Sequence, residues 1–129
     1  MIAVLLCNLM KILGIETSCD ETAAAVVEDG YKLLSNAVAS SMDLHVKYGG
    51  VVPEIAARSH IEAIQPVIDQ ALDDANCIWD DIDGIAVTYG AGLGGSLLIG
   101  VMTARTLAIT LDKPLYAINH VEAHVYANF

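Results

Sequence analysis

Three short apolar runs joined by polar turns begin near residue 11 and restrict the possible fold. The runs cover residues 12–15, 23–27 and 31–40. Glu28-Asp29-Gly30, between the second and third runs, is a tight turn of the Asp-Gly kind, which favours a β-hairpin. The polar segment Glu16–Thr22 joins the first two runs. Three strands connected so closely predict an antiparallel meander.

Helical spacing replaces this pattern after Gly49-Gly50. Pro53 suits the first turn of a helix, and apolar residues follow at helical intervals, namely Ile64, Val67, Ile68, Ala71 and Leu72. Pro66 lies inside this run, so we expect a kink or two abutting helices there. Three elements should follow: a strand over residues 83–89, a buried apolar helix over 97–111 and a strand over 115–118. The order predicts an α/β fold, with a mixed sheet and helices on both faces.

The composition excludes several classes of protein. With 55% hydrophobic and 17% charged residues, the 129-residue chain is suited to one domain with a well-buried core and not to disorder. Its net charge is −10, and its six Lys and Arg residues offer little to a polyanion. Cys7, Cys19 and Cys77 are odd in number and form no C-x-x-C, which fits reduced thiols in a cytoplasm.

The two ends of the sequence indicate where the domain begins and where it is cut. Met1–Met10 is apolar but has no basic flank or A-x-A-like cleavage site, and it is shorter than the roughly 20 residues that span a bilayer. We therefore expect residues 1–10 to be an N-terminal extension and residues 11–129 to form the domain. Val125–Phe129 shows no cap, glycine or charge that would end a helix, so we expect the chain to be cut within a helix beginning near His120.

Two segments have the composition of ligand sites. Gly90–Ser96 joins a strand to a helix, where backbone N–H groups and the helix dipole favour an anion. It lacks the Gly-Lys-Ser/Thr of a Walker A loop, and its glycines would equally allow close packing. The turn Glu16–Thr22 carries carboxylates and hydroxyls that can cradle phosphates or orient water or a metal. A solvated hairpin tip has the same composition, so both alternatives stay open.

His120 and His124 lie four residues apart and share one face if the segment is helical, close enough to bind one metal ion. Two ligands leave such a site incomplete, and a satisfied pair at a helix start is the alternative. A zincin peptidase needs a glutamate directly after the first histidine, where this chain has Val121. His45 and His60 stand alone and are expected to be surface or packing residues.

Four separated motifs together resemble the TsaD family of tRNA threonylcarbamoyl-adenosine modification proteins, once labelled O-sialoglycoprotein endopeptidases. The motifs are Gly14–Thr22, Gly49–Glu54, Gly90–Gly100 and His120–His124, in the family's order. The resemblance covers residues 11–129 and is bacterial in type. Ala91 departs from it, because the family usually has proline there, and this should loosen the loop.

The resemblance implies an actin/Hsp70/sugar-kinase (ASKHA) fold of two ribonuclease-H-like lobes, of which this chain resembles the first and lacks the second. It implies transfer of the threonylcarbamoyl group from threonylcarbamoyl-AMP to N6 of adenosine 37 in tRNAs that read ANN codons. Carried over by motif, His120 and His124 would be two ligands of one divalent metal ion, iron or zinc. Asp20 and Glu21 match the acidic catalytic pair. The third ligand, an aspartate, would lie in the second lobe.

Further expectations concern the glycine-rich loop, the partners and the location. Gly92, Gly94, Gly95 and Ser96 are the candidate anion or nucleotide side of the loop. The implied partners are tRNA, contacted mainly by the missing lobe and partner proteins, and TsaB-type and TsaE-type proteins, in the cytoplasm and without a membrane. The alternatives are a non-catalytic TsaB-like scaffold, which would need no histidine pair, and a metallopeptidase. The 129-residue chain alone should be inactive.

Overall fold

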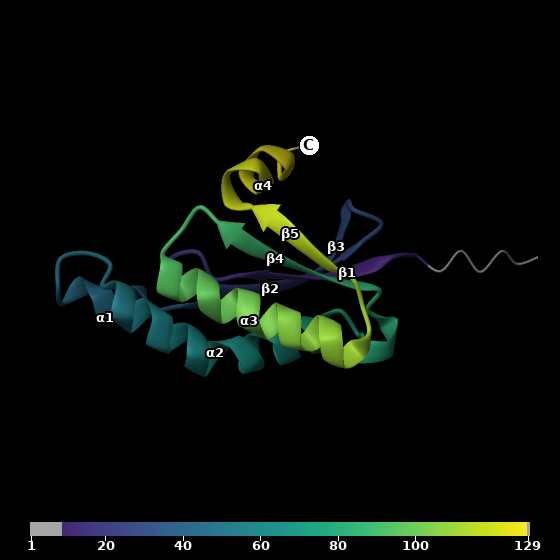
Figure 1. The fold of residues 1–129 in the computed structure, drawn as a ribbon, viewed down its shortest axis with the longest axis horizontal. Coiled ribbons are helices and arrows are strands. Elements are labelled where there is room, and N and C mark those ends of the chain that lie inside the picture. The colour runs from purple at the N-terminus through teal and green to yellow at the C-terminus, as the bar shows by residue number, and fades with distance from the viewer. Residues whose placement is uncertain (1–8, 129) are drawn as a thin grey trace, which may run out of the picture.

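The computed structural model describes residues 9–128, so the expectation about residues 1–8 lies outside the described residues. At its centre is one five-stranded sheet with the strand order β3-β2-β1-β4-β5 (Figure 1). Its strands are β1 (Lys11–Glu16), β2 (Glu21–Glu28), β3 (Lys32–Ser40), β4 (Gly84–Gly90) and β5 (Leu115–Asn119).

The first three strands form the predicted antiparallel meander. Lys11 of β1 pairs with Glu28 of β2, and Glu21 of β2 pairs with Ser40 of β3. Residues 29–31 connect β2 to β3, because Glu28 pairs with Lys32. Asp29 (φ 52°) and Gly30 (φ 78°) have left-handed backbone and form a tight turn, in which the Tyr31 N–H donates to the Glu28 carbonyl at 3.3 Å. The Asp-Gly signal therefore predicted this hairpin correctly.

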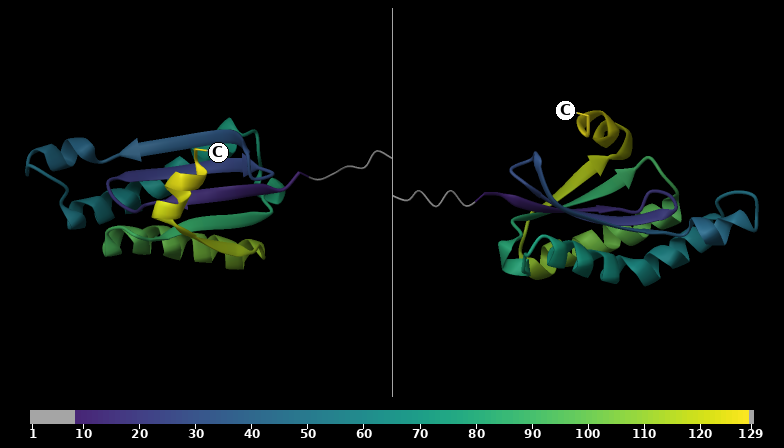
Figure 2. Two further views of the ribbon diagram at one scale, coloured as in Figure 1. Left: turned by 90° about the horizontal axis from the view of Figure 1, so that it is seen from above. Right: turned by 180° about the vertical axis from the view of Figure 1, so that it is seen from behind.

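Helices cover both faces of the sheet, as predicted. α2 (Pro53–Asp74) and α3 (Gly94–Leu111) lie on one face, and α4 (His120–Tyr126) lies on the other (Figures 1 and 2). A short 3-10 turn, η1 (Trp79–Asp81), precedes β4. β4 runs parallel to β1, and β5 runs parallel to β4. The sheet is thus antiparallel early in the chain and parallel late, which confirms the predicted α/β class.

Two details of the helices differ from expectation. A single helix, α2, runs through Pro66, so the prediction of two abutting helices is wrong. Pro66 is on the exposed side, while neighbours on both sides of it, Ile64 and Val67, are buried against the sheet and hold the helix together. The short helix α1 (Met42–Val46) was not predicted. At five residues it is too short for a periodic signal, and burial of His45 anchors it.

α3 corrects a further expectation, because it is not a buried helix. Its buried stripe consists of small residues at four-residue spacing, namely Ser96, Gly100, Ala104 and Ala108. Leu98, Met102 and Ile109 are 54%, 57% and 77% exposed. Small side chains let the helix lie close to the sheet, and the large ones then point outward. By length and composition alone, this one described helix would also suit a membrane span, which is weak evidence beside its packing on the sheet.

The hydrophobic core fills the layer between the sheet and the pair α2 and α3. It includes Leu13 and Val26 from the sheet, Ile82 and Ile85 at the start of β4, and Leu72 from α2, each at most 5% exposed. Burial of such side chains contributes about 1.5–3 kcal/mol each. The opposite face of the sheet carries α4 and the polar groups described next.

Candidate metal centre and acidic turn

His120 and His124 point their rings at each other from one side of α4. Asn119 caps the helix, since its side-chain oxygen accepts from the Val121 and Glu122 backbone N–H groups at 2.9 and 3.3 Å. The two histidines follow one turn apart, with Nε2 atoms separated by 3.0 Å and rings nearly perpendicular at 81°. The predicted sharing of one helix face is therefore confirmed.

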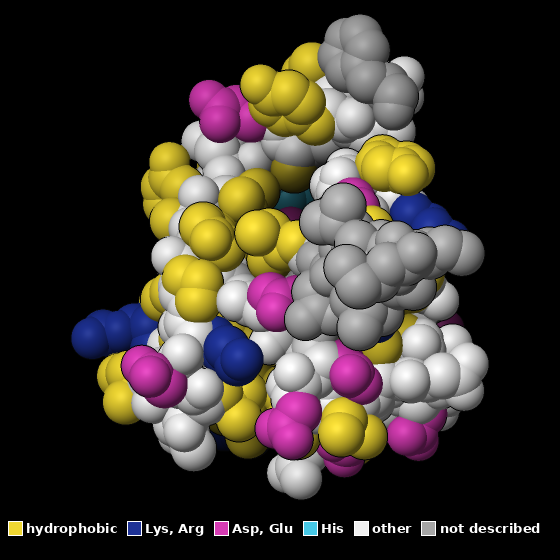
Figure 3. All heavy atoms as spheres, turned by 90° about the vertical axis from the view of Figure 1, so that its right-hand side faces the viewer, with side chains coloured by type: hydrophobic (Ala, Val, Ile, Leu, Met, Phe, Trp, Pro, Cys, Tyr) yellow, Lys and Arg dark blue, Asp and Glu magenta, His cyan; other side chains and the backbone are white. Residues whose placement is uncertain are grey.

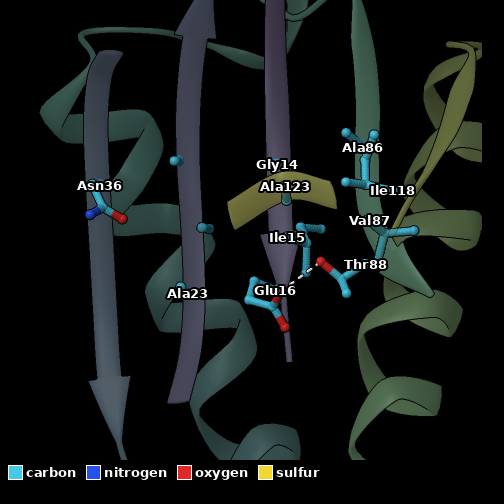
Figure 4. Close-up of a pocket in the computed structure, with 12 residues that line it drawn as sticks. Gly14, Ile15, Glu16, Ala23, Asn36, Ala86, Val87, Thr88, Ile118 and Ala123 are labelled. Carbon is cyan, nitrogen blue, oxygen red and sulfur yellow. Dashed lines mark hydrogen bonds between the residues drawn. The ribbon is translucent and has the colours of Figure 1, made fainter. Parts of the chain in front are cut away.

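Glu16, at the end of β1, holds the other nitrogen of His120. Its Oε2 lies 3.0 Å from His120 Nδ1 and also accepts from the Thr88 hydroxyl at 2.7 Å (Figure 4). Its Oε1 accepts from the Ser18 backbone N–H at 2.5 Å. Burial alone would raise the pKa of the Glu16 carboxyl, but the bonds from Ser18, His120 and Thr88 outweigh it and lower that pKa. The carboxylate therefore stays ionised and joins β1, β4 and α4.

This arrangement fixes the tautomer of the neutral His120 ring. A carboxylate only accepts, so Nδ1 of His120 carries the hydrogen and Nε2 presents its lone pair towards His124. Metal-bound histidines in proteins are usually oriented by a carboxylate in this way. In the sequence, Glu16 is only one of several polar residues in the turn Glu16–Thr22. Glu16 lies at the carboxyl end of β1, beside β4. Ligand-binding sites of α/β proteins usually lie at this end of the strands, and this position could have identified Glu16 as a site residue.

The histidine pair fits a metal ion as an open site. Two nitrogens bound to one tetrahedral zinc at about 2.0–2.1 Å lie about 3.3 Å apart, so Nε2 atoms 3.0 Å apart need only a small shift. Within residues 9–128, no group of three or more His, Cys, Asp or Glu side chains is placed to bind a metal. His120 and His124 can therefore supply two ligands, and other ligands must come from elsewhere.

The turn between β1 and β2 is packed and not a solvated hairpin tip. Thr17, Ser18 and Thr22 are 0%, 6% and 2% exposed. The Thr17 hydroxyl donates to the Ser96 carbonyl at 2.7 Å, and the Leu93 N–H donates to the Ser18 carbonyl at 2.8 Å. The turn is therefore bonded to the glycine-rich loop and to the first turn of α3.

The acidic pair follows directly in this turn. Asp20 is half-buried and Glu21 is exposed, so both carboxylates reach solvent. Ser18, two residues earlier, lies with its hydroxyl 3.2 Å from His120 Nδ1. This contact joins the turn to the histidine pair.

In the glycine-rich loop, the structure supports the close-packing alternative at one glycine. A Cβ added to Gly92 would lie 2.5 Å from the Ser18 carbonyl oxygen, so Gly92 is required for packing. Gly94 and Gly95 are exposed at the start of α3, whose N-cap Leu93 offers no side-chain acceptor to the first N–H groups. Ser96 is fully buried, and within residues 9–128 its hydroxyl has no hydrogen-bond partner. Anion binding at this helix start stays a prediction.

A shallow hollow of about 260 Å³ lies on the face of the sheet beneath α4 (Figure 4). Small side chains such as Ala25, Ala86 and Ala123 line most of it, and Glu16 and Thr88 stand at one end. The hollow therefore leads to the carboxylate that holds His120.

The chain is similar to the proteins of one curated family. A family model described as TsaD, tRNA N6-adenosine threonylcarbamoyltransferase, matches residues 32–129. The proteins of that name from Clostridium novyi (strain NT) and Caldicellulosiruptor bescii are 60% and 58% identical over 120 residues, 93% of this chain. The chain spans 35% and 36% of the length of these two relatives.

One similar solved structure is YeaZ from Pseudomonas aeruginosa, with a TM-score of 0.67 at 20% sequence identity. The match covers 86% of this chain and 43% of that chain. At this identity the likeness concerns the fold alone, and it agrees with the single lobe of an ASKHA fold that the resemblance implied.

Proposed function

Since the chain belongs to the TsaD family, we propose that it forms the metal-bearing wall of an enzyme that transfers a threonylcarbamoyl group to N6 of adenosine 37 in tRNAs reading ANN codons. The observation that carries this proposal is the convergence of two Nε2 atoms 3.0 Å apart, one of them on a ring held by Glu16. A metal-dependent transfer needs such a site. The family model and the similar relatives are both named tRNA N6-adenosine threonylcarbamoyltransferase.

The proposed donor is threonylcarbamoyl-AMP. The adenine amine attacks the carbamoyl carbon, a new N–C bond forms, the bond to the AMP phosphate oxygen breaks, and the amine loses a proton. Asp20 and Glu21 are the carboxylates proposed to orient the amine or accept this proton. Both reach solvent in the structure, as residues that meet an incoming tRNA must.

His120 and His124 are proposed to bind one iron or zinc ion, with an aspartate of the second lobe as the third protein ligand. When bound, the ion would stabilise negative charge developing on the carbamoyl oxygen or hold the threonyl carboxylate. Glu16 keeps the His120 lone pair directed at the site. We propose that Gly94, Gly95 and Ser96 at the start of α3 bind the phosphate side of the donor.

Contacts with tRNA are proposed to lie mainly outside this chain, in the second lobe and in TsaB-type and TsaE-type partner proteins. The chain carries only six Lys and Arg against 16 Asp and Glu. Figure 3 shows the end of the molecule where β1 begins, and there too acidic and apolar side chains are prominent and basic ones are sparse. Phosphate neutralisation needs cations, so this wall serves the reacting groups and not the tRNA backbone. We place the protein in the cytoplasm, without a membrane partner.

Two other functions fit the structure less well. A TsaB-like scaffold has no use for a histidine pair that a half-buried carboxylate orients, whereas this chain has both. A metallopeptidase of the zincin kind needs a glutamate after the first histidine, and Val121 stands there with an exposed, apolar side chain.

The test uses the full-length protein that contains this chain. It is incubated with tRNA, threonine, bicarbonate, ATP and its partner proteins, and the nucleosides are analysed by mass spectrometry. We expect modified adenosine with wild type and a loss of at least tenfold with His120→Ala, the order of effect expected when a metal ligand is removed. No product with wild type, or an unchanged yield with His120→Ala, would count against the proposed function.

A further inference from the structure

Two histidines outside the metal pair are buried beside the acidic turn. His45 of α1 is 1% exposed and His60 of α2 is 0% exposed. A buried imidazole destabilises a fold unless its nitrogens are hydrogen-bonded. Within residues 9–128, neither His45 nor His60 is hydrogen-bonded to the metal pair, and the partners of their four ring nitrogens show what they do.

His60 is hydrogen-bonded to the residues on both sides of the acidic pair. Its Nε2 lies 2.8 Å from the Cys19 carbonyl oxygen, which only accepts, so Nε2 carries the hydrogen and donates. Its Nδ1 lies 2.7 Å from the Thr22 hydroxyl and accepts from it in the neutral ring. Cys19 and Thr22 are the residues on either side of Asp20-Glu21. One rigid ring thus ties both flanks of the acidic pair to α2.

His45 reaches the same turn through Ser41. The Val52 N–H donates to His45 Nδ1 at 3.0 Å, so His45 Nε2 carries the hydrogen and donates to the Ser41 hydroxyl at 2.8 Å. That hydroxyl donates to the Asp20 carbonyl at 2.9 Å, and the Ser41 backbone N–H donates to the same oxygen at 3.0 Å. The carbonyl of Asp20 is therefore held by a chain of bonds that begins at the start of α2.

We propose that His60 and His45 are positioning residues that fix the Cys19 and Asp20 carbonyls and thereby aim the Asp20 and Glu21 carboxylates at the substrate amine. This rests on the proposed function, because the acidic pair acts only if the transfer occurs there. A carboxylate displaced by about 1 Å loses on the order of 100-fold in rate, so a clamp of this kind controls kcat. The metal pair is held mainly by Glu16 and by the contact between its own rings.

The principal variants are made in the full-length protein. His60→Leu removes both hydrogen bonds at similar volume, and His60→Gln keeps an N–H near the position of Nε2. Ile64→Ala is the matched control, since Ile64 is buried on α2 one turn away and its loss destabilises the core without removing a bond to the turn. Ser41→Ala removes the hydroxyl that links His45 to the Asp20 carbonyl, keeps the bond from the Ser41 backbone N–H, and serves if His60→Leu does not fold.

Four quantities are measured: kcat, KM for tRNA, bound metal, and the alkylation rate of Cys19 mapped by peptide mass spectrometry. Cys19 is exposed within the clamped turn, and buried Cys77 is the internal reference. We expect His60→Leu to lower kcat about 10- to 100-fold with KM for tRNA and metal content unchanged, and to speed alkylation of Cys19. His60→Gln should recover most of kcat, and Ser41→Ala should lower it several-fold.

The proposal is overturned if His60→Leu and Ser41→Ala keep the wild-type kcat and alkylation rate. It is also overturned if Ile64→Ala loses as much kcat as His60→Leu at a temperature where both are folded, because the effect is then only loss of stability. Failure of the proposed function is a separate result, in which wild type forms no modified adenosine. The alkylation rates of wild type and variants then still decide whether His60 and Ser41 hold the turn.

Discussion

Replacing Gly100 by alanine tests how closely α3 packs against the acidic turn. A Cβ at Gly100 would lie 2.5 Å from Thr17 Oγ1 and 3.3 Å from Thr17 Cγ2, and Thr17 is fully buried. Overpacking of this kind costs about 1–3 kcal/mol, and loss of the Thr17 bond to the Ser96 carbonyl costs about 0.5–1.5 kcal/mol. Alanine gains about 1 kcal/mol over glycine in a helix. Gly100→Ala should therefore lower the free energy of unfolding by about 1–3 kcal/mol.

Urea unfolding of wild type, Gly100→Ala, Thr17→Ala and the double variant measures this effect as a double-mutant cycle. Without the Thr17 side chain the added methyl meets no obstacle there, so Gly100→Ala should be neutral or stabilising by up to about 1 kcal/mol. Gly95→Ala is the control, because its Cβ would lie at an ordinary 3.6 Å from Ala57 Cβ. Equal effects of Gly100→Ala with and without Thr17 would refute the reasoning.

Three further predictions concern the site. Partial desolvation of the thiol, together with the Asp20 carboxylate, raises the pKa of Cys19. Asp20→Asn should therefore lower that pKa and speed alkylation of Cys19 at pH 8, whereas an unchanged profile of alkylation rate against pH would contradict this. In the full-length protein, Glu16→Gln should weaken metal binding about 10- to 100-fold in a competition titration, whereas wild-type affinity would show that Glu16 does not orient His120. The 129-residue chain alone should lose its metal on dialysis against a mild chelator and form no product; one-to-one retention would count against an open two-ligand site.

Local patterns predicted the strands, their order along the chain and the shared helix face of the histidine pair. The Asp29-Gly30 turn and the four-residue spacing of His120 and His124 are properties of neighbouring residues, and they survive in the fold. The short helix α1 escaped prediction because it is too short to show a period. The exposed side of α3 escaped prediction because this helix is apolar nearly all round, and such a pattern has no polar face to mark the side that meets solvent.

The connections that complete the site join residues far apart in the chain. Glu16 and His120 are separated by 104 positions, and Cys19 and His60 by 41. No spacing rule reports such contacts, since they depend on which strands become neighbours and on the face that receives α4. His45 and His60 therefore looked like isolated residues in the sequence, and the structure shows both to be buried and fully bonded.

Metal titration into the metal-free full-length protein tests the central claim most directly. Iron or zinc is added in steps to wild type and to His124→Ala, and modified adenosine is measured with the partner proteins present. The account predicts that wild-type product rises with metal and levels off at about one equivalent, as one shared site requires, while His124→Ala stays near background. Metal-free wild type as active as the loaded protein would contradict it.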